Sequence, residues 1–403
     1  MRYLFGYTRK KGRKVSMYKV CFVTTVSITL KSFVLELADA MHKTGNFEIH
    51  FVCDNDDEFK ASLPAYIHYH PISMKRGISF DGISVIRKLK RLFKQEKFDL
   101  VQYSTPNASL YASYAAKRAR IPVRLYCQWG IVYVGFNGIK RKIFKTIEKF
   151  VCRNSTRIEP DSKSNLNFGI SQGLYKEEKG TVIWNGSACG VNLKKFDISK
   201  KDAFRAEIRS KYNIPEDALV YIFVGRMNRD KGINELFSAS KNLIEQKDNA
   251  YLLMVGDMEG EQLLDSELLA WSKSCERVIY CGFTNQVEKY LGAADVYVLS
   301  SYREGFGTSV IEAEAMGVPV IVTEIPGPIN AMLKDKTGLV VPKMDASALF
   351  DAMLCLYEDR EKIVDFGKSG AEFAASSFEQ TELLRQIIAD RENMLNAVGG
   401  KNG

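Results

Sequence analysis

Residues 302–317 read YREGFGTSVIEAEAMG, and this stretch decides the fold. It follows an apolar run at 295–300 and precedes another at 318–323. Between the two runs, apolar positions recur at helical spacing until Gly317, so the pattern predicts a strand, a loop, a helix and a second strand. The loop of such a unit lies at the carboxyl edge of a parallel sheet, where ligands bind.

Two glycines bracket the predicted start of this helix. The first helical turn leaves backbone N–H groups unpaired, and these groups carry a positive partial charge. Gly305 and Gly307 have no Cβ, so a phosphate group can approach the N–H groups closely. The loop therefore predicts a phosphate site, and a diphosphate is its natural occupant.

Two glutamates lie eight positions apart on this unit. Glu304 stands before the helix and Glu312 about two turns into it, so they can reach hydroxyls on opposite sides of the phosphates. A sugar and a ribose fit those two positions. The alternative is that both are solvated charges on an amphipathic helix, but Phe306 and the two glycines favour the interpretation as a site.

A second loop carries two cations. Residues 225–232 read GRMNRDKG between an apolar strand pattern and a helix pattern, which places Arg226 and Lys231 at the same crevice edge. Together these cations can neutralise a leaving diphosphate without a metal ion. A solvated basic loop is the alternative.

Strand and helix patterns alternate in two series. The 403 residues, 46% of them apolar, suffice for two domains with full cores. We expect two doubly wound α/β domains, at 16–190 and 191–378, and a helix at 379–398 that packs back across both. The expected helices include segments at 31–44, 83–96, 139–152 and 260–274.

The charge is unevenly distributed. Residues 1–185 contain 32 Lys/Arg and 15 Asp/Glu, against 25 and 33 in the rest of the chain. A basic first half is typical of a protein that faces something anionic, such as a membrane, a nucleic acid or a phosphorylated substrate. The eight cysteines show no metal-ligand spacing and indicate free thiols in a reducing cytosol.

Three segments together resemble the retaining glycosyltransferases of family four, which have the two-domain GT-B fold. They are Glu304 to Glu312 (the EX7E motif), 225–232, and 185–196, which is similar to the family's "NGVD..F" hinge with an insertion. The resemblance covers roughly 18–395. It implies that Phe283 and Val287 frame the base. The remaining donor-site residues that it implies are Glu304 for the sugar, Arg226, Lys231, Gly305, Phe306, Gly307 and Thr308 for the diphosphate, and Glu312 for the ribose.

The resemblance also implies a reaction. The sugar is transferred with retention of anomeric configuration, and the leaving phosphate oxygen takes the acceptor proton. The implied donor is a nucleotide sugar, most simply a UDP-sugar, with no cofactor and no metal. The chain is similar to bacterial capsule, exopolysaccharide and O-antigen enzymes, which implies a lipid-diphosphate-linked glycan acceptor, a cytoplasmic location and no nucleic-acid partner.

Trp129 departs from the family pattern. Many relatives have a histidine in a "VHG" turn, whereas this chain reads CQWG at 127–130. An indole cannot act as a general base, so that function is absent or is replaced by stacking of a sugar. A tryptophan packed at a domain interface is the alternative.

Two patterns resemble metal ligands only superficially. The acidic run at 54–57 matches a DxD motif, but a solvated turn explains it better. His68 and His70 alternate at strand spacing and make a poor metal pair without further ligands.

Two basic segments, 86–94 and 139–147, combine cations with helical apolar spacing. The apolar stripe of each helix packs on the sheet first of all. Cations beside aromatic residues also suit peripheral binding to anionic lipid, so an anionic membrane surface is a candidate partner. The apolar run at 20–26 follows a basic start but is short, and it predicts a first strand rather than a secretion signal.

Two other functions compete with the transferase. UDP-N-acetylglucosamine 2-epimerases share the two-domain shape, but they need acidic and histidine groups near the sugar, and the four histidines fall outside the predicted crevice. A non-catalytic basic protein that binds membrane or nucleic acid on a transferase scaffold is the second. The intact glutamates and cations of the two loops argue against it.

Overall fold

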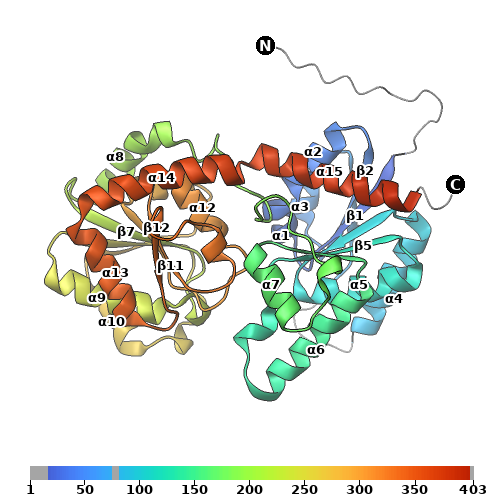
Figure 1. Cartoon of the computed structure of the whole chain (residues 1–403), viewed down its shortest axis with the longest axis horizontal. Helices are drawn as coiled ribbons and strands as arrows, with labels where there is room; N and C mark the ends of the chain where they lie inside the picture. The colour runs from blue at the N-terminus through green and yellow to red at the C-terminus, as the bar shows by residue number, and fades with distance from the viewer. Residues whose placement is uncertain (1–16, 75–80, 400–403) are drawn as a thin grey trace, which may run out of the picture.

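The computed structural model describes residues 17–74 and 81–399, and these form two α/β domains side by side (Figure 1). Each domain has a six-stranded parallel sheet. The strand order is β3-β2-β1-β4-β5-β6 in the first domain and β12-β11-β10-β7-β8-β9 in the second. Counted within each domain, both orders are the same doubly wound arrangement.

The N-terminal sheet is covered by helices on both faces. Its strands are β1 (Tyr18–Val23), β2 (Phe47–Cys53), β3 (Ile67–Pro71), β4 (Leu100–Tyr103), β5 (Val123–Gln128) and β6 (Arg157–Pro160). Its helices are α1 (Ser27–Phe33), α2 (Leu35–Lys43), α3 (Asp57–Ser62), α4 (Gly82–Glu96), α5 (Pro106–Ala119), α6 (Gly138–Asn154) and α7 (Lys163–Ser171). The segment expected as one helix at 31–44 is two helices, because the backbone turns at Val34 (φ −123°, ψ −31°).

The C-terminal domain repeats the pattern. Its strands are β7 (Leu219–Val224), β8 (Ala250–Val255), β9 (Val278–Gly282), β10 (Val296–Leu299), β11 (Val320–Thr323) and β12 (Gly338–Val341). Its helices are α8 (Lys201–Lys211), α9 (Ile233–Gln246), α10 (Ser266–Ser274), α11 (Val287–Ala293), α12 (Thr308–Ala315), α13 (Ala346–Glu358) and α14 (Arg360–Phe378). The expected helix at 260–274 begins only at Ser266, where Asp265 caps it by accepting from two backbone N–H groups.

Apolar runs form the central strands because helices cover both faces of each sheet. Leu219 to Phe223 are all at most 1% exposed, and Val20 to Val23 are equally buried. A strand buried on both faces is apolar at every position rather than at alternate ones.

The chain crosses between the domains twice, at neighbouring points. Val191 N–H donates to Phe378 O at 2.8 Å, and Gln380 N–H donates to Val191 O at 3.0 Å. These paired crossings place the linker of the first domain against the joint between α14 and the last helix, α15 (Gln380–Gly399). The two long helices run across the top of both domains in Figure 1.

Helix α15 belongs to the N-terminal core. Leu383, Ile387 and Leu395 are at most 3% exposed and join the apolar cluster under β1 and β2. Arg391, 1% exposed, donates to both carboxylate oxygens of Glu159, with the Nη2 to Oε1 distance at 2.8 Å. Helix α15 is therefore anchored in the N-terminal domain.

Candidate active site

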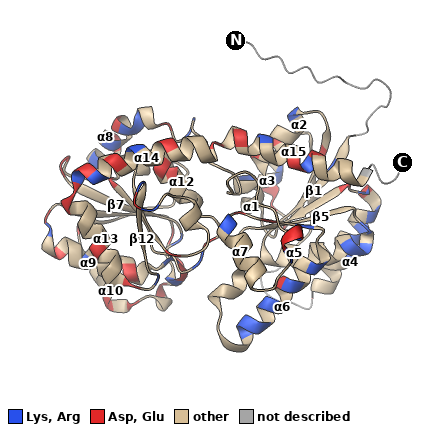
Figure 2. Cartoon of the chain, viewed as in Figure 1, with Lys and Arg blue, Asp and Glu red and all other residues tan. Residues whose placement is uncertain are grey.

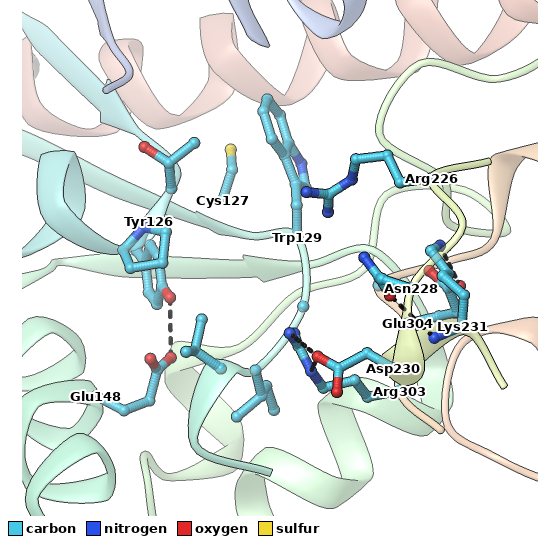
Figure 3. Close-up of a pocket in the computed structure, with 16 residues that line it drawn as sticks. Tyr126, Cys127, Trp129, Glu148, Arg226, Asn228, Asp230, Lys231, Arg303 and Glu304 are labelled. Atoms are coloured by element: carbon cyan, nitrogen blue, oxygen red, sulfur yellow. Dashed lines mark hydrogen bonds and ion pairs between the residues drawn. The ribbon is translucent and has the colours of Figure 1, made fainter. Parts of the chain in front are cut away.

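A cleft lies between the carboxyl edges of the two sheets (Figure 3). Its volume is about 320 Å³, and both domains line it. The C-terminal domain contributes the loops after β7 and β10, which carry Arg226, Lys231 and Glu304. The N-terminal domain contributes Trp129 after β5 and Glu148 on α6.

Glu304 and Lys231 form an ion pair in this cleft. Lys231 Nζ donates to Glu304 Oε1 at 2.6 Å, and the hydroxyl of Ser301 donates to the same oxygen at 2.6 Å. The two charged side chains are only 13% and 22% exposed. A largely desolvated contact thus joins the two loops that the sequence analysis identified. Lys231 and Glu304 both lie on the wall of the cleft.

The helix after Glu304 begins as the glycines predict. Gly307 has φ +88° and is the N-cap of α12, a left-handed backbone conformation that glycine adopts without strain. At Gly305 the constraint is space: a Cβ there would lie 2.5 Å from Asp161 Oδ2 and 3.1 Å from the carbonyl carbon of Trp129. Only glycine lets this loop pass so close to the other domain.

The side chain of Phe306 points into the core rather than into the cleft. It is 3% exposed and packs edge-on against Phe378, with ring centroids 5.2 Å apart. Only the backbone of Phe306 is therefore left for a ligand, in line with the amide function that the family resemblance implies for residues 305–308.

Glu312 is half-buried on α12 and does not line the cleft that holds Lys231 and Glu304. Burial raises its pKa to about 7, an effect that Lys195 opposes and Glu288 reinforces. Lys195 Nζ is 3.7 Å from Glu288 Oε2, so a small acidic group with one cation surrounds this carboxyl. A carboxyl held in such surroundings gains from donors such as ribose hydroxyls.

Arg226 reaches the cleft without joining the buried pair. It is 63% exposed, and its Nη1 lies 3.0 Å from Glu259 Oε2. Figure 3 shows its guanidinium extending toward the indole of Trp129. Trp129 is half-buried, and its ring centroid lies 5.4 Å from that of Phe33. The indole therefore lies between its own domain and the cation of the other one.

The two predicted base-framing residues differ in exposure. Phe283, just after β9, is 66% exposed, whereas Val287 starts α11 and packs partly against the C-terminal core. Neither lines the cleft that holds Glu304.

Helix α7 contacts the loop after β10 of the other domain, a contact that the sequence analysis did not predict. The side-chain amide of Asn165 donates to Gly305 O at 2.8 Å and to Asp161 Oδ1 at 3.1 Å. Burial raises the pKa of Asp161 to about 7; the bond from Asn165 opposes this and the charge of Glu304 reinforces it. The one available signal was the position of Asp161, directly after β6 at the carboxyl edge of the sheet.

Glu148 is a second missed residue. It lies on the buried face of α6, where Oε1 accepts from Tyr126 at 2.9 Å and from the amide of Gln128. Burial raises its pKa, and those two hydrogen bonds oppose the shift. An acidic residue within the apolar stripe of a basic helix was the signal.

The four histidines lie outside this cleft, on the N-terminal domain in α2, β2 and β3. The acidic run at 54–57 makes local contacts, where Asp56 caps α3 by accepting from Phe59 N–H. Neither set takes part in the site.

Comparisons with known proteins agree with this fold. Residues 204–373 match the family model "Glycosyl transferases group 1", and residues 19–162 match "Glycosyl transferase 4-like". The capsular polysaccharide biosynthesis glycosyltransferase CapM of Staphylococcus aureus is 28% identical over 88% of this chain and 92% of its own length.

Two further similarities complete the picture. A Campylobacter jejuni enzyme, N,N'-diacetylbacillosaminyl-diphospho-undecaprenol alpha-1,3-N-acetylgalactosaminyltransferase, is 28% identical over 71% of this chain and 75% of its own. The crystal structure of Anabaena Alr3699/HepE in complex with UDP superposes with a TM-score of 0.75 at 18% identity, covering 93% of this chain and 100% of that one. The two matched family domains, group 1 and 4-like, together cover most of the chain. The chain therefore belongs to the glycosyltransferases and has the GT-B fold.

The raised pKa of Glu312 has a measurable consequence for stability. A carboxyl with a pKa near 7 in the folded state and near 4.5 in the unfolded state costs stability as the pH rises between those values. We therefore expect Glu312→Gln to raise the free energy of unfolding at pH 8 by roughly 1–3 kcal/mol, and by much less at pH 5.

Urea denaturation at both pH values measures this difference. The exposed Glu324→Gln provides a matched control, with no difference between the two pH values. An equal increase in the free energy of unfolding by Glu312→Gln at pH 5 and pH 8 contradicts a raised pKa of Glu312.

Proposed function

We propose that this protein transfers a sugar from a nucleotide-diphosphate donor, a UDP-sugar, to a lipid-diphosphate-linked glycan with retention of anomeric configuration. The observation that carries the proposal is the buried Lys231–Glu304 pair, set in the cleft before the glycine-bracketed start of α12. This reaction is a step in the biosynthesis of a cell-surface polysaccharide.

The donor assignment follows from the chemistry of the loops. The backbone N–H groups of Gly305 to Thr308 and the cations of Arg226 and Lys231 bind the diphosphate, Glu304 binds sugar hydroxyls, and Glu312 binds the ribose. Phe283 and Val287 frame the base. With two cations beside the leaving diphosphate, the reaction needs no metal, and the leaving oxygen takes the acceptor proton. The UDP complex of the structural neighbour supports uracil as the base.

The acceptor assignment rests on the relatives. The Campylobacter enzyme acts on a diphospho-undecaprenol-linked sugar, and CapM is a capsule enzyme. On this chain the acceptor enters from the N-terminal side of the cleft, where Trp129 offers an indole face for a sugar and Glu148 a carboxylate for a hydroxyl.

Competing functions lack such support. An epimerase needs histidine and acidic groups at the sugar, and the histidines lie away from the cleft. The desolvated Lys231–Glu304 ion pair in the cleft argues against a non-catalytic protein on a transferase scaffold.

Nucleotide binding tests the donor proposal. By calorimetry, we expect the wild-type protein to select UDP over GDP and ADP, and to bind one UDP-sugar more tightly than UDP. Glu304→Ala removes the contact with the sugar but not with the diphosphate. It should bind UDP at least as tightly as the wild type, because Lys231 is no longer paired with Glu304. It should also lose the added affinity for the UDP-sugar, and lose turnover by about 100-fold or more.

The exposed Glu361→Ala on α14 is the matched control and should behave as the wild type. Equal weakening of UDP and UDP-sugar by Glu304→Ala would assign Glu304 to the phosphates instead. Absence of any nucleotide binding by the wild type would contradict the transferase proposal.

The protein acts in the cytoplasm at an anionic membrane surface, where a lipid-linked acceptor resides. Within residues 17–74 and 81–399, no helix is both long and apolar enough to span a bilayer. Lys and Arg repeat along α4 and α6 (Figure 2), and α6 exposes Ile139 by 77% and Ile143 by 47%. Exposed apolar side chains between cations suit insertion at a lipid interface.

Vesicle flotation tests the membrane contact. We expect the protein to float with vesicles containing anionic phosphatidylglycerol and much less with neutral phosphatidylcholine, and the double change Ile139→Asp and Ile143→Asp should abolish flotation. Leu263→Asp, which changes a residue that is 60% exposed on the other domain, is the control and should float normally. Equal binding to both vesicle types contradicts this contact.

A further inference from the structure

A polar cluster crosses two strands of the N-terminal sheet. Glu48 and His50 lie two positions apart on β2, and His68 and His70 lie two positions apart on β3. Residues two apart on a strand point to the same face. Since His50 and His68 are direct cross-strand partners, all four side chains gather on one face.

Three of these side chains converge. Glu48 Oε1 is 2.9 Å from His50 Nε2 and 3.9 Å from His68 Nε2, and one ligand atom from each of the three residues lies within 4.8 Å of the others. Zinc ligands at about 2.0–2.2 Å from a tetrahedral ion are about 3.3 Å apart. Glu48 and His50 are already near this spacing. The ring of His68, 54% exposed, stacks on that of His50 with centroids 4.5 Å apart, so a small shift of this side chain closes the remaining distance.

We propose that Glu48, His50 and His68 bind one transition-metal dication of the Zn²⁺ class. Two imidazoles and one carboxylate are typical ligands for this ion, and water completes its coordination. Because the ligands come from β2 and β3, the bound ion ties the edge strand β3 to the sheet.

His70 supplies the support that such a site needs. His70 Nε2 lies 3.0 Å from His50 Nδ1. When Nε2 of His50 coordinates the ion, Nδ1–H donates to His70, which fixes the tautomer and orientation of the ligand. The sequence alone presented His68 and His70 as a pair without further ligands; the sheet register adds His50 and Glu48 to them.

Lys19 competes with the ion for Glu48. Its Nζ lies 3.1 Å from Glu48 Oε1 and 3.2 Å from Glu96 Oε2. When the ion takes the Glu48 oxygen, Lys19 keeps its contact with Glu96. The nearby positive charge still weakens the site, so its removal strengthens metal binding.

The cluster is separate from the nucleotide cleft. Lys19, Glu48 and His68 are each the second residue of their strand, so they lie toward the amino edge of the sheet. The cleft is built at the opposite, carboxyl edge. The ion therefore acts on the stability of the domain and not on the transfer reaction.

The test uses the untagged full chain, stripped of metal with EDTA and titrated with ZnCl₂ by calorimetry. We expect one saturable ion per chain and a higher thermal unfolding midpoint in its presence. Co²⁺ in place of Zn²⁺ should give the intense visible absorption of a tetrahedral site. Absence of saturable binding overturns the proposal.

Variants locate the ion. His68→Ala changes an exposed side chain and should weaken Zn²⁺ binding by about 100-fold, and His70→Ala by about 10-fold. Lys19→Gln should tighten binding, an effect that a merely destabilised fold does not produce. His42→Ala is the matched control, because His42 stacks on Tyr66 outside the cluster.

If His68→Ala binds Zn²⁺ as tightly as the wild type, the ion binds elsewhere, and the assignment of Glu48, His50 and His68 as its ligands is wrong. UDP binding by His68→Ala should equal that of the wild type, so this result and the nucleotide experiments stand independently.

Discussion

The ion pair between Lys231 and Glu304 is the contact on which the cleft depends. It joins the loop after β7 to the loop after β10, two loops that leave adjacent parallel strands at the same sheet edge. Both side chains are largely buried, so each charge relies on the other for compensation. In the proposed reaction the pair divides: Lys231 turns to the diphosphate and Glu304 to the sugar.

The second constraint is the close approach of the two domains at Gly305. Asp161 and Trp129 leave no room there for a Cβ, and Asn165 bonds to the Gly305 carbonyl. The loop after β10 in one domain is thereby held by the other domain. The paired crossings at Val191 and Gln380 are the second place where the chain links the two domains.

The fold and half of the site could be predicted from the sequence because glycine-punctuated strand-to-helix loops are local patterns. The loops that carry Lys231 and Glu304 were predicted in this way, and the structure brings them together. Glu148, Asp161 and Asn165 were not predicted, because their contacts arise from packing between segments far apart in the chain. The break at Val34 escaped prediction for a related reason: apolar periodicity continues through it. The proposed metal site of Glu48, His50 and His68 depends on the register between β2 and β3, which no single strand encodes.

The measurement that tests the central claim most directly is a crystal structure of the protein with a non-transferable UDP-sugar analogue. The account predicts the β-phosphate at the backbone N–H groups of 305–308 beside Lys231, the sugar hydroxyls at Glu304 and the ribose at Glu312. A nucleotide bound with its phosphates away from this loop, and with the Lys231–Glu304 pair intact, would contradict it.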